Sequence, residues 1–237
     1  MTESPKGDLS SDFLALSDAW IEAYPGAHAG VLAMRGVANP GESAPLRERR
    51  LELEESLRVR FSGNDRAALR THPTLRAYAE YYKRFDKTYH VQLQLESIAF
   101  KGKSMPANAA LVEAMFMAEL DNLLLTAGHD MDALHGSLML DVATGTESYI
   151  LLRGTPQAPK PGDMMIRDGA GIISSIVYGP DRRTQIGPET TRAVFTVYAP
   201  AGIAPEAAVI HLTEIATLAK LVAPAARVDL LQVYPGD

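Results

Sequence analysis

The sequence predicts an α+β fold in which helices cover a mixed β-sheet. Helical patterns dominate residues 1–126, and short β-type segments separated by Gly, Pro and Asp follow between residues 136 and 200. A helix and then a strand close the chain. Runs of helices followed by runs of strands are typical of α+β proteins and not of a regular βαβ winding. With 237 residues, of which 46% are hydrophobic, the chain is long enough to bury a large core.

The chain is expected to begin with a helix and a strand. The helix spans residues 10–26, with Ser and Asp as capping candidates at its start and a Pro-Gly pair at its end. Residues 28–39, "HAGVLAMRGVAN", are typical of a strand, and the turn "NPGES" follows them.

A charged helix is predicted over residues 45–61. Its leucines and Phe61 are spaced toward a core, and charged residues occupy most other positions. Arg50 lies one turn before Glu54, and Glu54 lies one turn before Arg58, so we expect two ion pairs. The stretch "RERR" is interpreted as a solvated face, with contact to tRNA or to a protein partner as the alternative.

Three segments follow before the strands begin. A Tyr-rich amphipathic helix is expected over residues 74–85. Residues 89–106 are ambiguous, because "VQLQL" alternates like a strand whereas the apolar spacing also suits a helix. The clearest helix of the chain runs from about Asn108 to Thr126, where Gly128 is expected to stop it.

The second half is predicted to be mainly β-structure. Strands are expected over residues 136–143, 147–154, 162–168, 171–179 and 192–200. An Ala-rich helix between prolines follows at residues 204–224, and a closing strand at residues 226–234. The apolar face of this helix is expected to pack on the protein's own sheet, with packing on a second subunit as the alternative.

Composition narrows the function classes. Without cysteine there is no disulfide, thiolate nucleophile or Cys-ligated zinc. The net charge of −6 argues against a protein that mainly grips DNA, yet residues 1–105 carry 15 Lys/Arg against 14 Asp/Glu while the rest carries 8 against 15. Any polyanion should therefore contact the first half. No apolar run spans a bilayer and residues 1–12 lack a signal-peptide core, so we expect a cytoplasmic protein without membrane contact.

The stretch "HDMDALHG", residues 129–136, sets two histidines and two aspartates within eight positions. Zinc and iron sites use such residues, but these histidines are six apart and no His-Glu-x-x-His pattern accompanies them. Aspartates at a helix–strand junction commonly cap a turn by accepting backbone N–H bonds. We therefore predict a capping turn, with no metal and no cofactor.

Other chemically suggestive groups are less specific. There is no Gly-x-Ser-x-Gly elbow, and Ser174 and Ser175 lie in an apolar strand, where a packing role is expected. His211 and Glu214, one turn apart on the last helix, are interpreted as surface residues, with metal ligation as the alternative. The loop "YGPDRRTQIGPET", residues 178–190, is the most crowded with polar groups and is either a structural turn or a ligand site.

The order and spacing of several segments resemble the tRNA-binding editing domain of the phenylalanyl-tRNA synthetase β subunit, the module of its third and fourth B regions, in free-standing form. The segments are "KGKSMP", "ALVEAMF", "HDMDALHG", a strand pair, "PGDMMIRD" and "DRRTQIGPETTRAVFTV", between about Tyr82 and Ala199. The resemblance implies a helical extension over residues 1–81 packed on an editing-like domain over residues 82–237. It also implies a three-layer fold with a β-sandwich-like core flanked by helices.

In that family the pocket accepts the aminoacylated end of tRNA and hydrolyses wrongly attached tyrosine. An aminoacyl ester is already activated, so orienting one water and stabilising the oxyanion suffices, without a metal or covalent intermediate. The resemblance implies a tRNA-binding, trans-acting protein that hydrolyses mischarged aminoacyl-tRNA. The sequence shows no ATP-binding synthetase motif, so a complete ligase is not expected.

Candidate site residues follow from the resemblance. Glu113 and Asp181 would be the catalytic residues that position water. Substrate binding would fall to Asn108, Tyr178, Arg182, Arg183 and Thr184. The basic residues expected to meet tRNA phosphates are Arg76, Lys83, Arg84, Lys87, Lys101 and Lys103.

Departures from the family pattern keep a second hypothesis open. Glu113 and Phe116 stand where members commonly carry Asp and Asn, and "SIVYGPD" replaces a Trp-containing segment of free-standing relatives. The alternative is a binding module that holds a free amino acid or similar small molecule without catalysis. A second copy of the chain is a further candidate partner.

Overall fold

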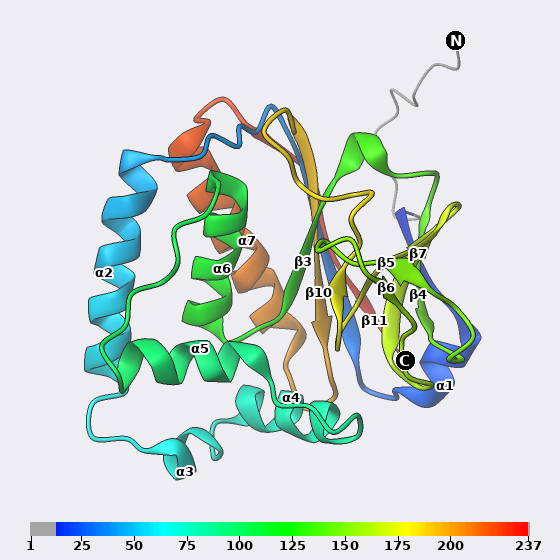
Figure 1. Cartoon of the computed structure of the whole chain (residues 1–237), viewed down its shortest axis with the longest axis horizontal. Helices are drawn as coiled ribbons and strands as arrows, with labels where there is room; N and C mark the ends of the chain where they lie inside the picture. Colours follow the sequence, from blue (N-terminus) through cyan, green and yellow to red (C-terminus); the bar gives the residue numbers. More distant parts are fainter. Residues whose placement is uncertain (1–12, 237) are drawn as a thin grey trace.

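Two sheets and a layer of helices lie one behind another in the computed structural model, which describes residues 13–236 (Figure 1). The middle layer is a four-stranded sheet composed, in spatial order, of β11 (Arg227–Pro235), β2 (His28–Arg35), β10 (Arg192–Ala199) and β3 (Thr126–Asp130). The second sheet is composed of β1 (Leu14–Leu16), β4 (Leu138–Val142), β7 (Met164–Asp168), β8 (Gly171–Ser175) and β9 (Gly179–Pro180). The predicted α+β fold class with a β-sandwich-like core is confirmed.

Helices α6 and α7 cover the outer face of the four-stranded sheet, and α2 packs on them from the side away from the sheet, as Figure 1 shows. This layer contains α2 (Ala44–Arg60), α3 (Arg66–Leu69), α4 (Pro73–Lys83), α5 (His90–Ala99), α6 (Ala110–Asn122) and α7 (Pro205–Val222). A short helix, α1 (Asp18–Ala23), and a two-stranded ribbon, β5 (Tyr149–Ile150) with β6 (Pro156–Gln157), lie with the second sheet.

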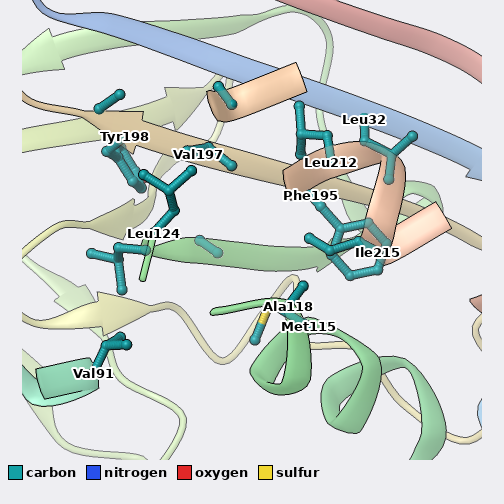
Figure 2. Packing of buried hydrophobic residues seen from close by; sticks show 14 of the residues in the cluster. Leu32, Val91, Met115, Ala118, Leu124, Phe195, Val197, Tyr198, Leu212 and Ile215 are labelled. Atoms are coloured by element: carbon teal, nitrogen blue, oxygen red, sulfur yellow. The ribbon is translucent and has the colours of Figure 1, made fainter. Parts of the chain in front are cut away.

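The main hydrophobic core lies between α7 and the four-stranded sheet. Figure 2 shows Leu212 and Ile215 of α7 beside Leu32 and Phe195 of the sheet, and all four side chains are fully buried. Gly30 permits this close approach, because a Cβ there would lie 2.9 Å from Leu212 Cδ1. The prediction that α7 packs on the protein's own sheet is therefore confirmed.

The Tyr-rich helix α4 is fixed by buried hydroxyl groups. Tyr78 donates a hydrogen bond to the carbonyl oxygen of Tyr198 at 2.5 Å and accepts one from the Leu125 backbone N–H at 3.0 Å. Its ring stacks on Tyr89, with 4.3 Å between the centroids. Tyr hydroxyls are buried in proteins where they find such partners, so α4 can pack apolar ring faces without leaving a polar atom unpaired.

The predicted helix over residues 10–26 is wrong in part. Residues 10–12 lie outside the described chain, and Leu14–Leu16 form β1, which pairs in parallel with β4. The helix begins only at Asp18, where the Ser17 hydroxyl caps it by accepting from the Trp20 N–H at 3.1 Å. Three residues of sheet pairing thus override the local helical pattern.

Gly128 does not stop the long helix. Helix α6 ends at Asn122, and Leu123 takes the left-handed conformation at φ 62°, a role usually given to Gly. Thr126 already belongs to β3, which pairs with β10. Of the ambiguous residues 89–106, His90–Ala99 form helix α5 and residues 102–106 form a loop.

The first 81 residues supply more than helices. Strand β2, predicted from "HAGVLAMR", is an inner strand of the middle sheet and lies between β11 and β10. The strands predicted over residues 136–143, 162–168 and 192–200 are confirmed as β4, β7 and β10, whereas only Tyr149–Ile150 of 147–154 and Gly171–Ser175 of 171–179 form the strands β5 and β8. The strand β3 was not predicted. The division of the chain at residue 82 stays a prediction.

Candidate functional site

A cavity of about 330 Å³ lies between α6, strand β3 and the segment that follows β8. Helix α6 lines it with Val112, Met115, Phe116 and Glu119. The opposite wall is formed by Gly179, Pro180, Gln185 and Ile186. This volume falls in the range of roughly 300 to 1,000 Å³ that is typical of small-molecule sites. The proposed catalytic residues Glu113 and Asp181 do not line this cavity.

The absence of a side chain at Gly128 keeps the cavity open. A Cβ there would lie 2.9 Å from Ile186 Cδ1 and 3.2 Å from both Met115 Sδ and Phe195 Cδ1. Gly128 belongs to the edge strand β3 and itself lines the cavity. Glycine inside a strand often marks such a close approach, and here it leaves room between α6 and Ile186.

Glu113 faces away from this cavity. Its side chain is 6% exposed and lies 3.3 Å from Arg50 NH1 of α2, in an ion pair that joins the two helices. The predicted pair of Arg50 with Glu54 is wrong for this reason, whereas Glu54 does pair with Arg58 at 3.1 Å. Glu113 thus has a structural partner, and its catalytic role stays a prediction.

Arg50→Ala is expected to destabilise the protein by about 2 to 3 kcal/mol, because it leaves the Glu113 carboxylate buried without its charge partner. Arg50 is 13% exposed, so the expected loss is smaller than for a fully buried pair. The midpoint of urea unfolding, at constant m-value, measures it. The control is Arg49→Ala, which removes an exposed pair with Glu52 and should change stability by less than about 0.5 kcal/mol. Equal effects of the two variants would contradict the structural role.

Asp181 is held in a tight turn instead of pointing into the cavity. It accepts hydrogen bonds from the Thr184 N–H at 3.0 Å and from the Thr184 hydroxyl. Burial raises the pKa of Asp181, and the hydrogen bonds from Thr184 oppose this rise. Arg183 donates to the Ala133 carbonyl and to Asp168, each at 2.8 Å. Of the two interpretations of this loop, the contacts within the described chain favour the structural turn.

The "HDMDALHG" stretch joins the same turn. Asp130 caps the short 3-10 helix Met131–Ala133 by accepting from the Asp132 N–H at 2.9 Å, so the capping prediction is confirmed. His129 is fully buried, and its Nδ1 lies 2.7 Å from the Thr184 hydroxyl oxygen. Burial lowers the pKa of His129 to about 3, so its ring is neutral and serves as a hydrogen-bonding partner.

His211 is not a surface residue. It is fully buried, and its Nε2 lies 2.5 Å from the Thr126 hydroxyl oxygen. Glu214 accepts a hydrogen bond from the Asn122 side chain at 2.6 Å. Within residues 13–236, the side chains of Glu214 and His211 thus have different hydrogen-bond partners. Ser174 is buried and bonds the Tyr198 hydroxyl, as expected of a packing role.

The remaining predicted substrate residues do not line the cavity. Asn108 donates to the Pro106 carbonyl at 3.0 Å, within its own loop. The Arg182 backbone N–H donates to the Ile150 carbonyl at 2.8 Å. Tyr178 packs against the small apolar cluster of the second sheet, and Lys87 Nζ lies 5.9 Å from the centre of its ring.

Glu119 is the carboxyl group that does line the cavity. It is 1% exposed and accepts a hydrogen bond from the Thr126 N–H at 2.8 Å. Burial raises the pKa of Glu119 to about 8. The group is therefore mostly protonated at pH 7 and can donate a hydrogen bond into the cavity. Val112, Met115 and Phe116 precede Glu119 at helical spacing, so an acid within this apolar stripe was the available sequence signal.

His90 supplies a basic nitrogen at the same cavity. It begins helix α5, and its Nδ1 lies 3.4 Å from the Tyr82 hydroxyl. His90 is an exposed residue, and desolvation of its ring by the neighbouring residues lowers its pKa, which favours the neutral imidazole that can accept a proton. The sequence pattern did not single out His90, because a histidine at a helix start carries no spacing signal.

A basic groove of about 510 Å³ runs between α4 and α5. Its cationic residues are Arg66, Arg70, Arg76, Lys83 and Lys87, against the acidic Glu80 and Glu96. Three of the predicted tRNA-binding residues thus lie together. Arg84 does not line this groove and instead lies over the rings of Tyr24, Tyr81 and Phe85 at 5.1 to 5.8 Å.

Within residues 13–236, no group of three or more His, Asp or Glu side chains is close enough together to hold a metal ion. No helix in this part of the chain has the length and apolar character needed to cross a bilayer.

No family model matches the chain. The phenylalanine–tRNA ligase β subunits of Mycoplasma pneumoniae and Mycoplasma genitalium are each 33% identical to it over 69 residues, which cover 29% of this chain and 9% of theirs. An N-terminal fragment of the phenylalanyl-tRNA synthetase β subunit from Pyrococcus horikoshii superimposes with a TM-score of 0.50 at 10% identity, over 95% of this chain and 55% of that chain. The chain thus has the fold of about half of that fragment, and a short stretch of its sequence is similar to a phenylalanine–tRNA ligase β subunit.

Proposed function

We propose that this protein binds the aminoacylated 3′ end of tRNA and hydrolyses the ester of a mischarged amino acid. The observation that carries the proposal is the position of the cavity next to the basic groove. Lys87 and Tyr89 line the groove, and His90, the next residue in the chain, lines the cavity. A phosphate backbone in the groove could therefore deliver its terminal aminoacyl group to the cavity. The similarity to a tRNA ligase subunit supports the same ligand class.

The cavity has the chemical groups that ester hydrolysis needs. His90 would accept a proton from a water whose oxygen attacks the ester carbonyl carbon. Protonated Glu119 would donate a hydrogen bond to the oxyanion that develops on the carbonyl oxygen. The bond between that carbon and the ribose oxygen then breaks, and the proton held by His90 passes to the ribose hydroxyl. Free amino acid and uncharged tRNA are the products.

The catalytic proposal is tested with purified protein and a panel of mischarged tRNAs, including tyrosyl-tRNA(Phe). We expect release of at least one amino acid to be accelerated over buffer, in proportion to protein concentration. A protein with Glu113→Gln should release it at nearly the wild-type rate if Glu119 and His90 act. Loss of activity in Glu113→Gln at unchanged stability would return the catalytic role to Glu113. Release no faster than in buffer for the whole panel would exclude catalysis.

Reversing the charge of two groove residues, Lys83→Glu with Lys87→Glu, is expected to weaken tRNA binding and to flatten its salt dependence. Each phosphate contact contributes roughly 0.7 to 0.9 to the slope of log K against log salt, so the slope should fall by about 1.4 to 1.8. Binding measured between 50 and 200 mM salt gives the slope.

Lys220→Glu is the matched control, because Lys220 is exposed on α7 and remote in sequence from the groove. An equal loss of affinity in this variant would show that the groove is not the contact surface.

One observation favours the second function, a non-catalytic module that binds a free amino acid. No carboxylate pair faces the cavity, since Glu113 and Asp181 have partners elsewhere. Thermal-shift measurements with single amino acids discriminate the two functions, because a ligand that binds only the folded state raises the melting temperature. A shift with an amino acid, without tRNA binding, would support the module.

A further inference from the structure

A second hollow opens beside the cavity, between α5, the loop 103–106 and α6. We call it the recess, and its volume is about 360 Å³. Its apolar surface comes from Leu93, Ile98, Met105, Phe116 and Leu120. Polar groups stand at its margin, namely the Gln94 amide, the Ser97 hydroxyl and the ammonium of Lys103. Such a surface suits a flat, largely apolar ligand that has polar edges and a nearby negative charge.

The basic groove, the recess and the cavity form a continuous series. Leu93 lines both the groove and the recess. His90 and Phe116 line both the recess and the cavity. Leu93 and His90 belong to α5, so this helix lines all three hollows. A chain that enters along the groove meets the recess before it meets the cavity.

We propose that the recess binds the base of the terminal nucleoside that carries the aminoacyl group. This inference rests on the proposed function, because it takes the ligand of the cavity to be an aminoacylated RNA end. The base would lie against Phe116 and Leu93, and its edge would meet Gln94 and Ser97. Base contact with aromatic and apolar side chains is a general source of affinity for single-stranded nucleic acids.

The positive charge around the recess favours a nucleotide over an apolar peptide as its ligand. Lys103 is exposed at the rim, and the adjoining groove adds Arg76, Lys83 and Lys87. A 5′-phosphate attached to the nucleoside would find a cation at either side of the recess. The Ser97 hydroxyl donates to the Leu93 carbonyl at 3.0 Å and keeps its lone pairs free to accept from a base amino group.

The test compares two stable ligands that differ only in the nucleoside. One is an amino acid amide, and the other is the same amino acid in amide linkage to 3′-amino-3′-deoxyadenosine. A series with phenylalanine, tyrosine, leucine and methionine is titrated into the full chain by calorimetry. We expect the adenosine conjugate of the best amino acid to bind at least about tenfold more tightly than its amide, since one stacked base contributes that much or more.

Blocking the recess should remove this gain and nothing else. Ser97→Trp fills the recess from α5 and is expected to weaken the conjugate by roughly tenfold, while the amide keeps its affinity within about twofold. Ser56→Trp on the exposed side of α2 is the matched control and should change neither. Lys103→Glu, in a loop, is a second variant that does not depend on tolerance for Trp. It is titrated with the adenosine conjugate that carries a 5′-phosphate, and it should weaken the binding of this ligand several-fold.

The outcomes separate the inference from the function on which it rests. If the wild-type protein binds the amide and the conjugate equally well, the recess does not bind the nucleoside base, and only the inference fails. If Ser97→Trp weakens both ligands alike, the recess is not a separate subsite and the inference fails again. If wild type binds no amide, no conjugate and no tRNA, the proposed function and the inference fall together.

Discussion

Replacing the Glu119 carboxyl by an amide is expected to stabilise the protein at pH 8 while changing it little at pH 5. The folded-state pKa of Glu119 is about 8, above the ordinary value of 4.5. The folded protein therefore keeps a proton that the unfolded chain releases. This contribution to stability is complete below pH 4.5 and is lost as the pH rises through about 8.

The variant Glu119→Gln removes this titration and keeps an oxygen that accepts from the Thr126 N–H. The difference in unfolding free energy between variant and wild type should grow by roughly 3 to 4 kcal/mol from pH 5 to pH 8. Urea unfolding at both pH values measures it. Asp163, whose pKa is raised to about 6 by burial, is present in both proteins and cancels from the difference.

The control is Glu48→Gln, at an exposed position of α2. Its difference from wild type should not depend on pH. A difference for Glu119→Gln that stays constant between pH 5 and pH 8 would mean that Glu119 is already ionised in the folded protein, and its proposed role as a hydrogen-bond donor would be lost.

The second large effect concerns catalysis by the same residue. Glu119→Leu removes the donor to the oxyanion and is expected to lower the deacylation rate by roughly 10² to 10³-fold, the usual effect of deleting one such donor. Glu119→Gln retains a neutral donor of similar shape and should keep most of the rate. Single-turnover deacylation of a mischarged tRNA, with Kd measured separately, tells loss of chemistry from loss of binding.

The pH dependence of the deacylation rate distinguishes a catalytic role of Glu119 from a purely structural one. The wild-type deacylation rate should decline above about pH 8, where Glu119 loses its proton, whereas the Glu119→Gln variant should keep its rate to higher pH. On the acid side both proteins should decline as His90 becomes protonated, at a pH below its ordinary range because desolvation of the ring lowers its pKa. Glu119→Gln as slow as Glu119→Leu at every pH would instead identify Glu119 as a base.

The order of elements was largely predictable, because hydrophobic period and turn residues are local properties. The ends of the first helix and of α6 were not, because sheet pairing decides them. Leu14–Leu16 join β4, and Thr126 joins β10, through hydrogen bonds to strands more than sixty residues away. Arg50 likewise pairs with Glu113 of another helix and not with the nearer Glu54.

The side chains of the candidate site could not be predicted from the sequence. The resemblance pointed to Glu113 and Asp181, whereas the cavity is lined by other residues of α6 and of the 178–190 loop. Which acid on α6 faces inward depends on how the helix is rotated in its packing. Glu113 turns toward α2 and Glu119 toward β3, and sequence spacing alone does not fix that rotation.

A structure of the protein bound to an aminoacyl amide of 3′-amino-3′-deoxyadenosine tests the central claim most directly. The account predicts the amino acid side chain between α6 and Ile186, with its carbonyl oxygen within hydrogen-bond distance of Glu119 and the linkage near His90. A ligand bound instead against Asp181 or Glu113, with the cavity between α6 and Ile186 unfilled, would contradict it.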